Sequence, residues 1–244
     1  MGEPVRKAAG PRVLAGSSGF SYKPWRGAFY PEKLPESGML AWYAARLPVV
    51  EINNTFYRMP RPAMLGAWAG QVPDGFRFAL KAPQRITHQH RLKDADKTVG
   101  AFFAAAAALG DRLGPALFQL PPHLRKDLPL LEAFLAALPP GRRVAFEFRH
   151  PSWFEDDVRA ALAARGAALC ISETEEAAST APLVATTGWG YLRLRRADYA
   201  EADLRRWAER IGSQPWSEAY VFFKHEDKGV APRLAARLME IVAA

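Results

Sequence analysis

Short apolar segments that end in a charged or amide residue, followed by a turn, recur along the whole chain. They are residues 49–53 (VVEIN), 76–81 (FRFALK), 116–119 (ALFQ), 144–149 (VAFEFR) and 220–224 (YVFFK). A strand that is buried on both faces reads as continuous apolar sequence, and a polar residue at its carboxyl end can face a ligand. The repetition therefore predicts one site built from many strand ends.

Helical patterns separate most of the strand candidates, which number eight. The strand candidates are residues 13–15, 49–52, 76–81, 116–119, 144–148, 168–171, 191–194 and 219–223, and the helix candidates are residues 38–46, 61–70, 96–110, 128–138, 155–165, 202–211 and 232–242. Alternating strands and helices imply a parallel sheet with right-handed crossovers. At 244 residues the pattern predicts an α/β protein, a single TIM-type (β/α)8 barrel. An open doubly wound sheet is the alternative, but no Gly-x-Gly-x-x-Gly motif follows the first strand.

Nothing in the composition divides the chain into two domains. We expect residues 1–12 to form a flexible tail and residues 13–244 to form one barrel domain. The tail lacks the apolar core of a signal peptide, and no segment reaches the roughly 18 apolar residues of a membrane helix. We therefore expect a cytoplasmic protein without a membrane partner. Cys170 stands alone in an apolar segment, which excludes an internal disulfide and favours a core position.

The chain is basic, with 33 Lys and Arg against 25 Asp and Glu and a formal net charge of +8. A basic balance favours anionic partners such as nucleic acid or phosphorylated metabolites. Much of the arginine lies in helix candidates beside alanine and glutamate, as in residues 205–210 (RRWAER), which is also typical of a solvated helix face.

Several motifs together resemble the YecE-like family, also called domain-of-unknown-function family 72. They are residues 16–22 (GSSGFSY) with Trp25, 29–31 (FYP), 51–57 (EINNTFY), 78–81 (FALK), 86–88 (ITH), 119–122 (QLPP) and 147–153 (EFRHPSW). The resemblance runs from about residue 13 to the C-terminus and implies a TIM-type barrel, with no established activity to transfer. The chain departs from a common family pattern at residues 193–196 (RLRR) and 223–227 (FKHED), and both departures add cations.

A TIM barrel carries its active site at the carboxyl ends of its strands. Because these ends meet at one rim, we expect the polar residues there to converge. The predicted catalytic residues are Glu147, Glu51 and His88, and the predicted substrate-binding residues are Tyr22, Trp25, Asn53, Tyr57, Lys81, Gln119, Arg149, Trp153, Arg193, Arg195 and Lys224.

Glu147 and Arg149 are two residues apart on one strand end, so their side chains point to the same side. One interpretation is a catalytic base held ionised by an arginine that also binds substrate; the other is an internal ion pair that fills the top of the barrel. Glu51 could converge with Glu147 as a second acid/base group, as in a glycosidase, or as a metal ligand. The alternative is a hydrogen-bonding role that fixes the loops.

The cations at the ends of the third, fifth, seventh and eighth strands predict a phosphate or carboxylate clamp, with loop cations balanced by nearby acids as the alternative. The predicted clamp comprises Lys81, Arg149, Arg193, Arg195 and Lys224. The loop aromatics Tyr22, Trp25, Tyr57 and Trp153 could stack on bases or sugars, or could pack the loops together.

The chain has five histidines, and their spacing matches no standard metal motif. The cofactor is therefore unknown: a single divalent metal ion is possible but not favoured.

We carry three hypotheses for function. The first is an acid–base enzyme, a hydrolase or lyase, acting on an anionic, phosphate-bearing substrate that could be nucleic acid, with His88 as proton shuttle. The second is a glycosidase-like hydrolase that uses Glu51 and Glu147, and the third is a non-catalytic module that binds an anionic ligand.

Overall fold

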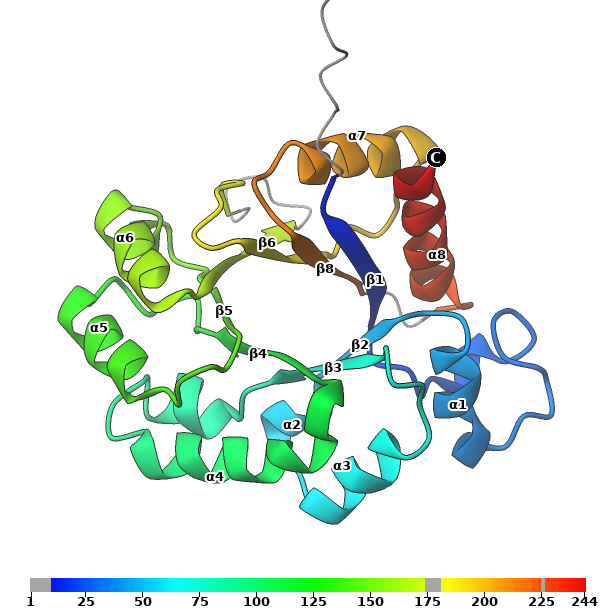
Figure 1. Cartoon of the computed structure of the whole chain (residues 1–244), viewed down its shortest axis with the longest axis horizontal. Helices are drawn as coiled ribbons and strands as arrows, with labels where there is room; N and C mark the ends of the chain where they lie inside the picture. Colours follow the sequence, from blue (N-terminus) through cyan, green and yellow to red (C-terminus); the bar gives the residue numbers. More distant parts are fainter. Residues whose placement is uncertain (1–9, 174–180, 225–226) are drawn as a thin grey trace, which may run out of the picture.

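The strands form a closed, entirely parallel barrel in sequence order, which confirms the predicted TIM-type fold. The structure is a computed structural model and describes residues 10–173, 181–224 and 227–244. The strands are β1 Arg12–Ser18, β2 Val49–Ile52, β3 Arg77–Lys81, β4 Leu113–Gln119, β5 Val144–Glu147, β6 Ala168–Glu173, β7 Trp189–Leu194 and β8 Glu218–Phe223. Figure 1 looks down this ring of strands, with helices around its outside.

Helices follow most strands and cover the outer face of the barrel. They are α1 Met39–Ala44, α2 Asn54–Tyr57, α3 Pro62–Ala69, α4 Asp96–Ala106, α5 Leu128–Ala137, α6 Asp156–Arg165, α7 Glu201–Gly212 and α8 Val230–Ala243. Local chemistry sets several boundaries. Asp127 caps α5 by accepting a hydrogen bond from the Leu130 amide, and Gly166 ends α6 in the left-handed conformation at φ 69°.

Each of the eight predicted strands is present, within a few residues of its predicted bounds. The seven predicted helices are also present, while α2 and the π-helical turn Arg85–Gln89 were not predicted. The first nine residues of the expected tail lie outside the described part of the chain, and its last residue, Arg12, is the first residue of β1. Residues 174–180, between β6 and β7, lie outside the described part of the chain as well.

Two apolar clusters share the strands because alternate side chains face opposite ways. The larger cluster lies between the strands and the helices. The smaller one fills the barrel interior and comprises Leu14, Val49, Ala79, Leu117, Ala145, Ala168, Cys170, Trp189, Tyr191, Tyr220 and Phe222. Cys170 therefore has the core position expected for it, and burial raises the pKa of its thiol well above the ordinary value.

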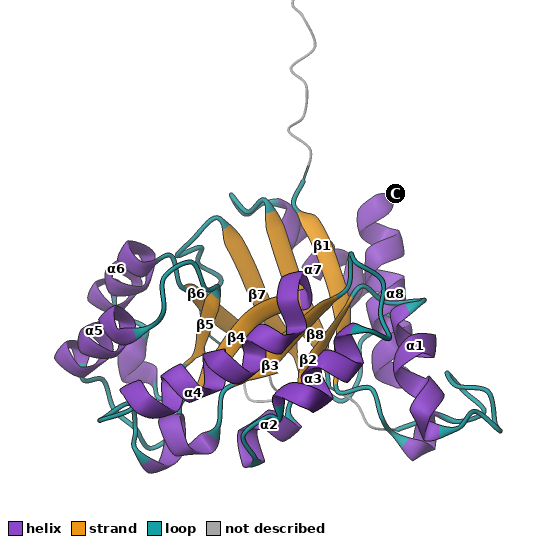
Figure 2. Ribbon diagram, turned by 60° about the horizontal axis from the view of Figure 1, so that its bottom comes forward, coloured by secondary structure: helices purple, strands orange, loops and turns teal. Residues whose placement is uncertain are grey.

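The two edges of the barrel carry different elements. Figure 2 views the barrel from the side, with α2 below the strands and the C-terminal end of α8 above them. Because α2 directly follows β2, it marks the edge where the strands end, which we call the mouth.

In the part of the chain that the structure describes, every helix is too short or too polar to cross a membrane.

Candidate functional site

The side chains inside the barrel are apolar along most of its length and become polar or charged at the level next to the mouth. Five of the strand positions in the inner cluster are Val49, Ala79, Leu117, Ala145 and Tyr191. Two residues further along the same strands, and therefore on the same side, stand Glu51, Lys81, Gln119, Glu147 and Arg193. The alternation of side chains thus gathers five polar residues that are far apart in sequence into the top layer of the barrel.

Arg193 joins the two predicted catalytic glutamates across this layer. Its Nη1 donates to Glu147 Oε2 at 2.6 Å, and its Nη2 donates to Glu51 Oε1 at 2.9 Å. Both glutamates are 0% exposed and Arg193 is 3% exposed. The geometry therefore matches the internal ion pair that we gave as the alternative interpretation. The carboxylates do not face the open space that a glycosidase needs between them.

Further donors contact both carboxylates. The Ser18 hydroxyl donates to Glu51 Oε1 and the Tyr191 hydroxyl donates to Glu51 Oε2, each at 2.7 Å. Arg149 Nε donates to Glu147 Oε1 at 3.0 Å, and Arg195 Nη1 lies 3.8 Å from the same oxygen. Each glutamate is therefore held as a carboxylate by at least three neighbours.

The electrostatics agree with this arrangement. Burial alone would raise the pKa of Glu147, but the charges of Arg193, Arg149 and Arg195 outweigh burial and lower it to about 2. For Glu51 burial is likewise outweighed by Arg193, and the pKa is lowered. Both groups are ionised at neutral pH and already bonded, so neither is suited to donate or take a proton there.

Lys81 is in a different setting from the other cations of the mouth. Among the described residues, no hydrogen bond or ion pair of its ammonium is present; Nζ lies 4.0 Å from the centre of the Phe56 ring. Burial first, and then the charge of Arg193, lower the pKa of Lys81 to about 8. The amine is therefore partly unprotonated just above neutral pH.

His88 lies on the same aromatic ring. Its imidazole packs edge-on against Phe56, with ring centres 4.9 Å apart, and its Nδ1 is 2.9 Å from the Thr87 hydroxyl. Burial and then the charges of Lys81 and Arg149 lower the pKa of His88, so the ring is neutral at pH 7. A neutral imidazole can either accept or donate a proton, which keeps the predicted role of proton shuttle open to His88.

The mouth carries an excess of positive charge. Four cations, Lys81, Arg149, Arg193 and Arg195, accompany two carboxylates, which leaves a formal charge of +2 while Lys81 is protonated. The Arg149 side chain is 31% exposed and that of Arg195 is 20% exposed, so both reach the surface of the mouth. An anion that enters here meets cations whose nearby carboxylates are already neutralised.

Buried polar atoms without a partner are concentrated in the same region. Of seven such side-chain atoms in the described part of the chain, four are Asn53 Oδ1, Ser172 Oγ, Arg193 Nε and Arg195 Nε. Leaving a buried polar atom without a partner costs about 1–3 kcal/mol, so native proteins usually pair such atoms with protein, water or ligand. Their clustering at the mouth therefore points to a ligand or ordered water there.

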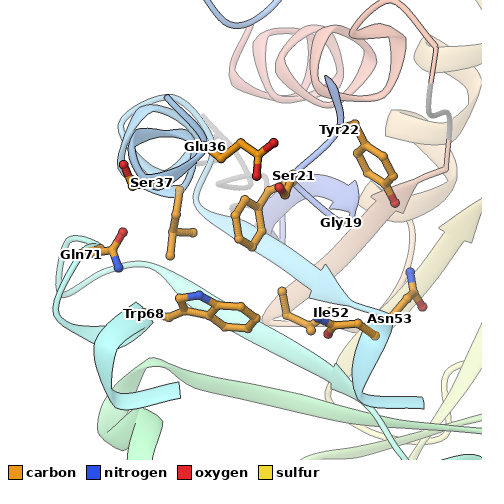
Figure 3. Close-up of a pocket in the computed structure, with 12 residues that line it drawn as sticks. Gly19, Ser21, Tyr22, Glu36, Ser37, Ile52, Asn53, Trp68 and Gln71 are labelled. Carbon is orange, nitrogen blue, oxygen red and sulfur yellow. The ribbon is translucent and has the colours of Figure 1, made fainter. Parts of the chain in front are cut away.

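A pocket of about 470 Å³ lies beside the loop after β1, the end of β2 and α3. Its apolar wall contains Phe20, Leu40, Ile52 and Trp68, and Tyr22 and Asn53 lie at one end of it (Figure 3). Tyr22 and Asn53 were predicted as substrate-binding residues. The Tyr22 hydroxyl donates to the Ser18 carbonyl at 2.7 Å, which ties the wall of the pocket to the residue that contacts Glu51.

The loop aromatics divide between core and surface. Trp25 is 0% exposed and lies 6.0 Å from Tyr30 in a stacked arrangement. Trp153 stacks on Phe148 at 4.7 Å and its indole nitrogen donates to the Leu124 carbonyl at 2.7 Å. Trp25 and Trp153 are therefore buried and pack the loops together, which agrees with the alternative given for the loop aromatics.

The remaining predicted residues have individual positions. Tyr57, at the end of α2, is 75% exposed, and Lys224 is exposed immediately after β8. Gln119 is 7% exposed and pairs in register with Glu147. Across the described residues, no group of three or more His, Cys, Asp or Glu side chains could hold a metal ion.

Sequence reasoning missed three residues that shape the mouth. Tyr191 contacts Glu51, Ser172 contributes an unpartnered hydroxyl, and Phe56 contacts both Lys81 and His88. The period-two spacing from Tyr191 to Arg193 was a usable signal for the first. Phe56 carried none, because its contact depends on the short helix α2.

A family-level sequence model described as "Protein of unknown function DUF72" matches residues 14–244. The UPF0759 protein YecE of Escherichia coli (strain K12) is 37% identical over 113 residues, which are 46% of this chain and 42% of that protein. The UPF0759 protein YunF of Bacillus subtilis (strain 168) is 29% identical over 139 residues, 52% of this chain and 48% of that protein. Each match thus covers less than half of the curated relative.

A solved structure extends the likeness to nearly the whole chain. The crystal structure of a DUF72 family protein from Thermotoga maritima MSB8 is similar with a TM-score of 0.85 and 27% sequence identity. The match covers 96% of this chain and 100% of that one. The likeness includes the complete barrel.

Proposed function

The chain belongs to the DUF72 family, and from that premise we propose that it is an enzyme that acts on a small anionic substrate in the mouth of its barrel. One observation carries the proposal. Lys81 lies in the top layer and Arg149 and Arg195 reach the surface of the mouth, while both carboxylates of that layer are already bonded to Arg193. A phosphate or carboxylate group is the ligand that this excess of cationic donors suits best.

The proposal assigns the residues new roles. Arg149, Arg195 and Lys81 hold the anion, while Glu147 and Glu51 act as positioning residues that fix Arg193 and keep the floor of the site rigid. Proton transfer falls to Lys81 and His88, whose pKa values are both lowered toward or below neutral pH. This assignment replaces the earlier one of Glu147 as the base.

The neighbouring pocket supports a small substrate. Its volume of about 470 Å³ is within the usual range for small-molecule sites, roughly 300–1,000 Å³, and most of its wall is apolar. A substrate whose anionic group binds the cations could place an apolar part between Leu40, Ile52 and Trp68. The unpartnered Asn53 Oδ1 at the end of the pocket could accept a hydrogen bond from that substrate.

The glycosidase alternative receives no support from the geometry. A glycosidase acid must be protonated near neutral pH, whereas the pKa of Glu147 is held at about 2 and that of Glu51 is also lowered. A non-catalytic anion-binding module would use the same cations, and it differs from the enzyme only in lacking turnover.

The test is calorimetric titration with inorganic phosphate, comparing the unaltered protein with an Arg149→Gln, Arg195→Gln double variant. Hydrogen bonds to charged groups contribute about 1.5–3 kcal/mol each, so we expect phosphate affinity to fall at least about tenfold. Arg206→Gln is the matched control, because Arg206 is exposed on α7 and its ion pair in the described part of the chain is with Asp203. Equal phosphate affinity in the double variant and the control would contradict the proposal.

A further inference from the structure

Lys81 stands out in the mouth as a primary amine that is accessible, yet closely surrounded by charge. It is the last residue of β3, and its side chain follows Ala79 on the inner side of the strand. Arg193, Glu147, Glu51 and Arg149 all act electrostatically on its ammonium. Because the arginines occupy the carboxylates, no carboxylate bonds to the amine in the described part of the chain.

We propose that the Lys81 amine is a nucleophile, and that the substrate is a carbonyl compound carrying a phosphate or carboxylate group. The inference rests on the proposed function, because the anionic group brings the carbonyl carbon to Lys81 by binding Arg149 and Arg195. An amine beside other cations is favoured in its neutral, nucleophilic form. Nζ also lies 4.0 Å from the centre of the Phe56 ring, which fixes the position of the amine on one side.

The reaction balances without any redox partner. The amine lone pair forms a C–N bond to the carbonyl carbon while the C=O π bond breaks, and the oxygen takes up a proton to give a carbinolamine. Loss of that hydroxyl as water, with the remaining N–H proton leaving, gives an imine. The net change is amine plus carbonyl compound to imine plus water.

His88 is placed to serve these proton transfers. Its ring contacts the same Phe56 side chain as Lys81, and the charge of Lys81 lowers its pKa. A neutral imidazole can give a proton to the departing hydroxyl and recover one from the amine. Glu147 is unsuited to this role, because three arginines hold it as a carboxylate.

If this reaction occurs, Lys81 should react with carbonyl compounds faster than other lysines of the protein. At pH 7.5 an amine with a pKa of about 8 is roughly one-quarter unprotonated, whereas an ordinary lysine near 10.4 is unprotonated in about one molecule in a thousand. Lys97, exposed on α4, is an internal reference in the same protein.

In the experiment, the intact protein is incubated with glyoxylate, a small anionic aldehyde, in the presence of sodium cyanoborohydride. The cyanoborohydride reduces any imine to a stable secondary amine. Peptide mass spectrometry then gives the labelling rates of Lys81 and Lys97. We expect glyoxylate to label Lys81 at least about tenfold faster than Lys97 at pH 7.5, because an amine with a pKa of about 8 has roughly 200 times more free base than a lysine of ordinary pKa.

Acetaldehyde, which has no carboxylate, is the control for anion guidance. The Lys81-to-Lys97 ratio should be higher with glyoxylate than with acetaldehyde, and inorganic phosphate should lower it. Equal labelling of the two lysines, or equal ratios with the two aldehydes, would overturn the inference. If Lys81 is not labelled while phosphate still binds by calorimetry, the nucleophile is refuted and the anion site stands; if phosphate does not bind, the proposed function fails first.

Discussion

Replacing Glu147 by glutamine tests whether the arginines of the mouth are held by a buried carboxylate. The substitution keeps the shape of the side chain but removes its charge, leaving Arg193, Arg149 and Arg195 without their shared partner. The pKa of Glu147 is about 2 in the folded protein against an ordinary value of 4.5. At about 1.4 kcal/mol for each tenfold change in proton affinity, the ionised carboxylate stabilises the fold by about 3 kcal/mol.

The pH dependence of this effect has a definite sign. Because folding lowers the pKa of Glu147, its stabilisation is complete above about pH 4.5 and is lost as the pH falls through about 2. Glu147→Gln should therefore reduce the free energy of unfolding by about 3 kcal/mol at pH 7 and by only about 1 kcal/mol at pH 3. Solvent screens the charge of Glu147 little, because the side chain is 0% exposed.

Urea denaturation followed by circular dichroism at pH 7 and pH 3 measures both differences. The matched control is Glu209→Gln, which removes an exposed glutamate of α7 and should change stability by less than about 0.5 kcal/mol. A Glu147→Gln protein within 1 kcal/mol of the unaltered protein at pH 7, or a deficit that is the same at both pH values, would refute the reasoning.

Three further outcomes follow from the same geometry. Arg193→Met leaves two buried carboxylates without their common cation and should cost about 3–5 kcal/mol by urea denaturation; a smaller loss than that of Glu147→Gln would count against the ion network. Trp153→Phe removes the indole donor and should cost about 1 kcal/mol of stability while leaving phosphate affinity unchanged. Weaker phosphate binding in this variant would instead indicate that Trp153 contacts the ligand. Tyr57→Ala should leave phosphate affinity, measured by calorimetry, within about twofold of that of the unaltered protein. The alternative is tested by fluorescence anisotropy with a single-stranded oligonucleotide. If the oligonucleotide binds the unaltered protein and binds this variant about tenfold more weakly, the substrate is nucleic acid instead.

The sequence was sufficient to predict the barrel and the rim where its polar residues gather. Continuous apolar segments identified the strands, and the period of two placed Glu147 on the same side of the strand as Arg149. The same period of two predicts the direction of the other top-layer side chains, because side chains alternate along a strand whatever the rest of the fold.

The partners of these residues could not be predicted, because they depend on distances across the barrel. Arg193 contacts glutamates that are 142 and 46 residues away, and only the closed ring brings the three strands together. Burial of Trp25 and Trp153 was also undetermined, since loop aromatics stack on ligands or on one another with similar sequence patterns. The near-neutral amine of Lys81 follows from its surroundings and has no signature in the chain.

The most direct test of the anion site is a crystal soaked with selenate, whose selenium can be located by anomalous scattering. A pocket at the opposite edge of the barrel is lined by Arg77, Arg142 and Arg143 with Glu218, and serves as an internal comparison. We predict selenate within hydrogen-bonding distance of Lys81, Arg149 and Arg195. Selenate bound only at the Arg77 pocket, with none at the mouth, would contradict the account.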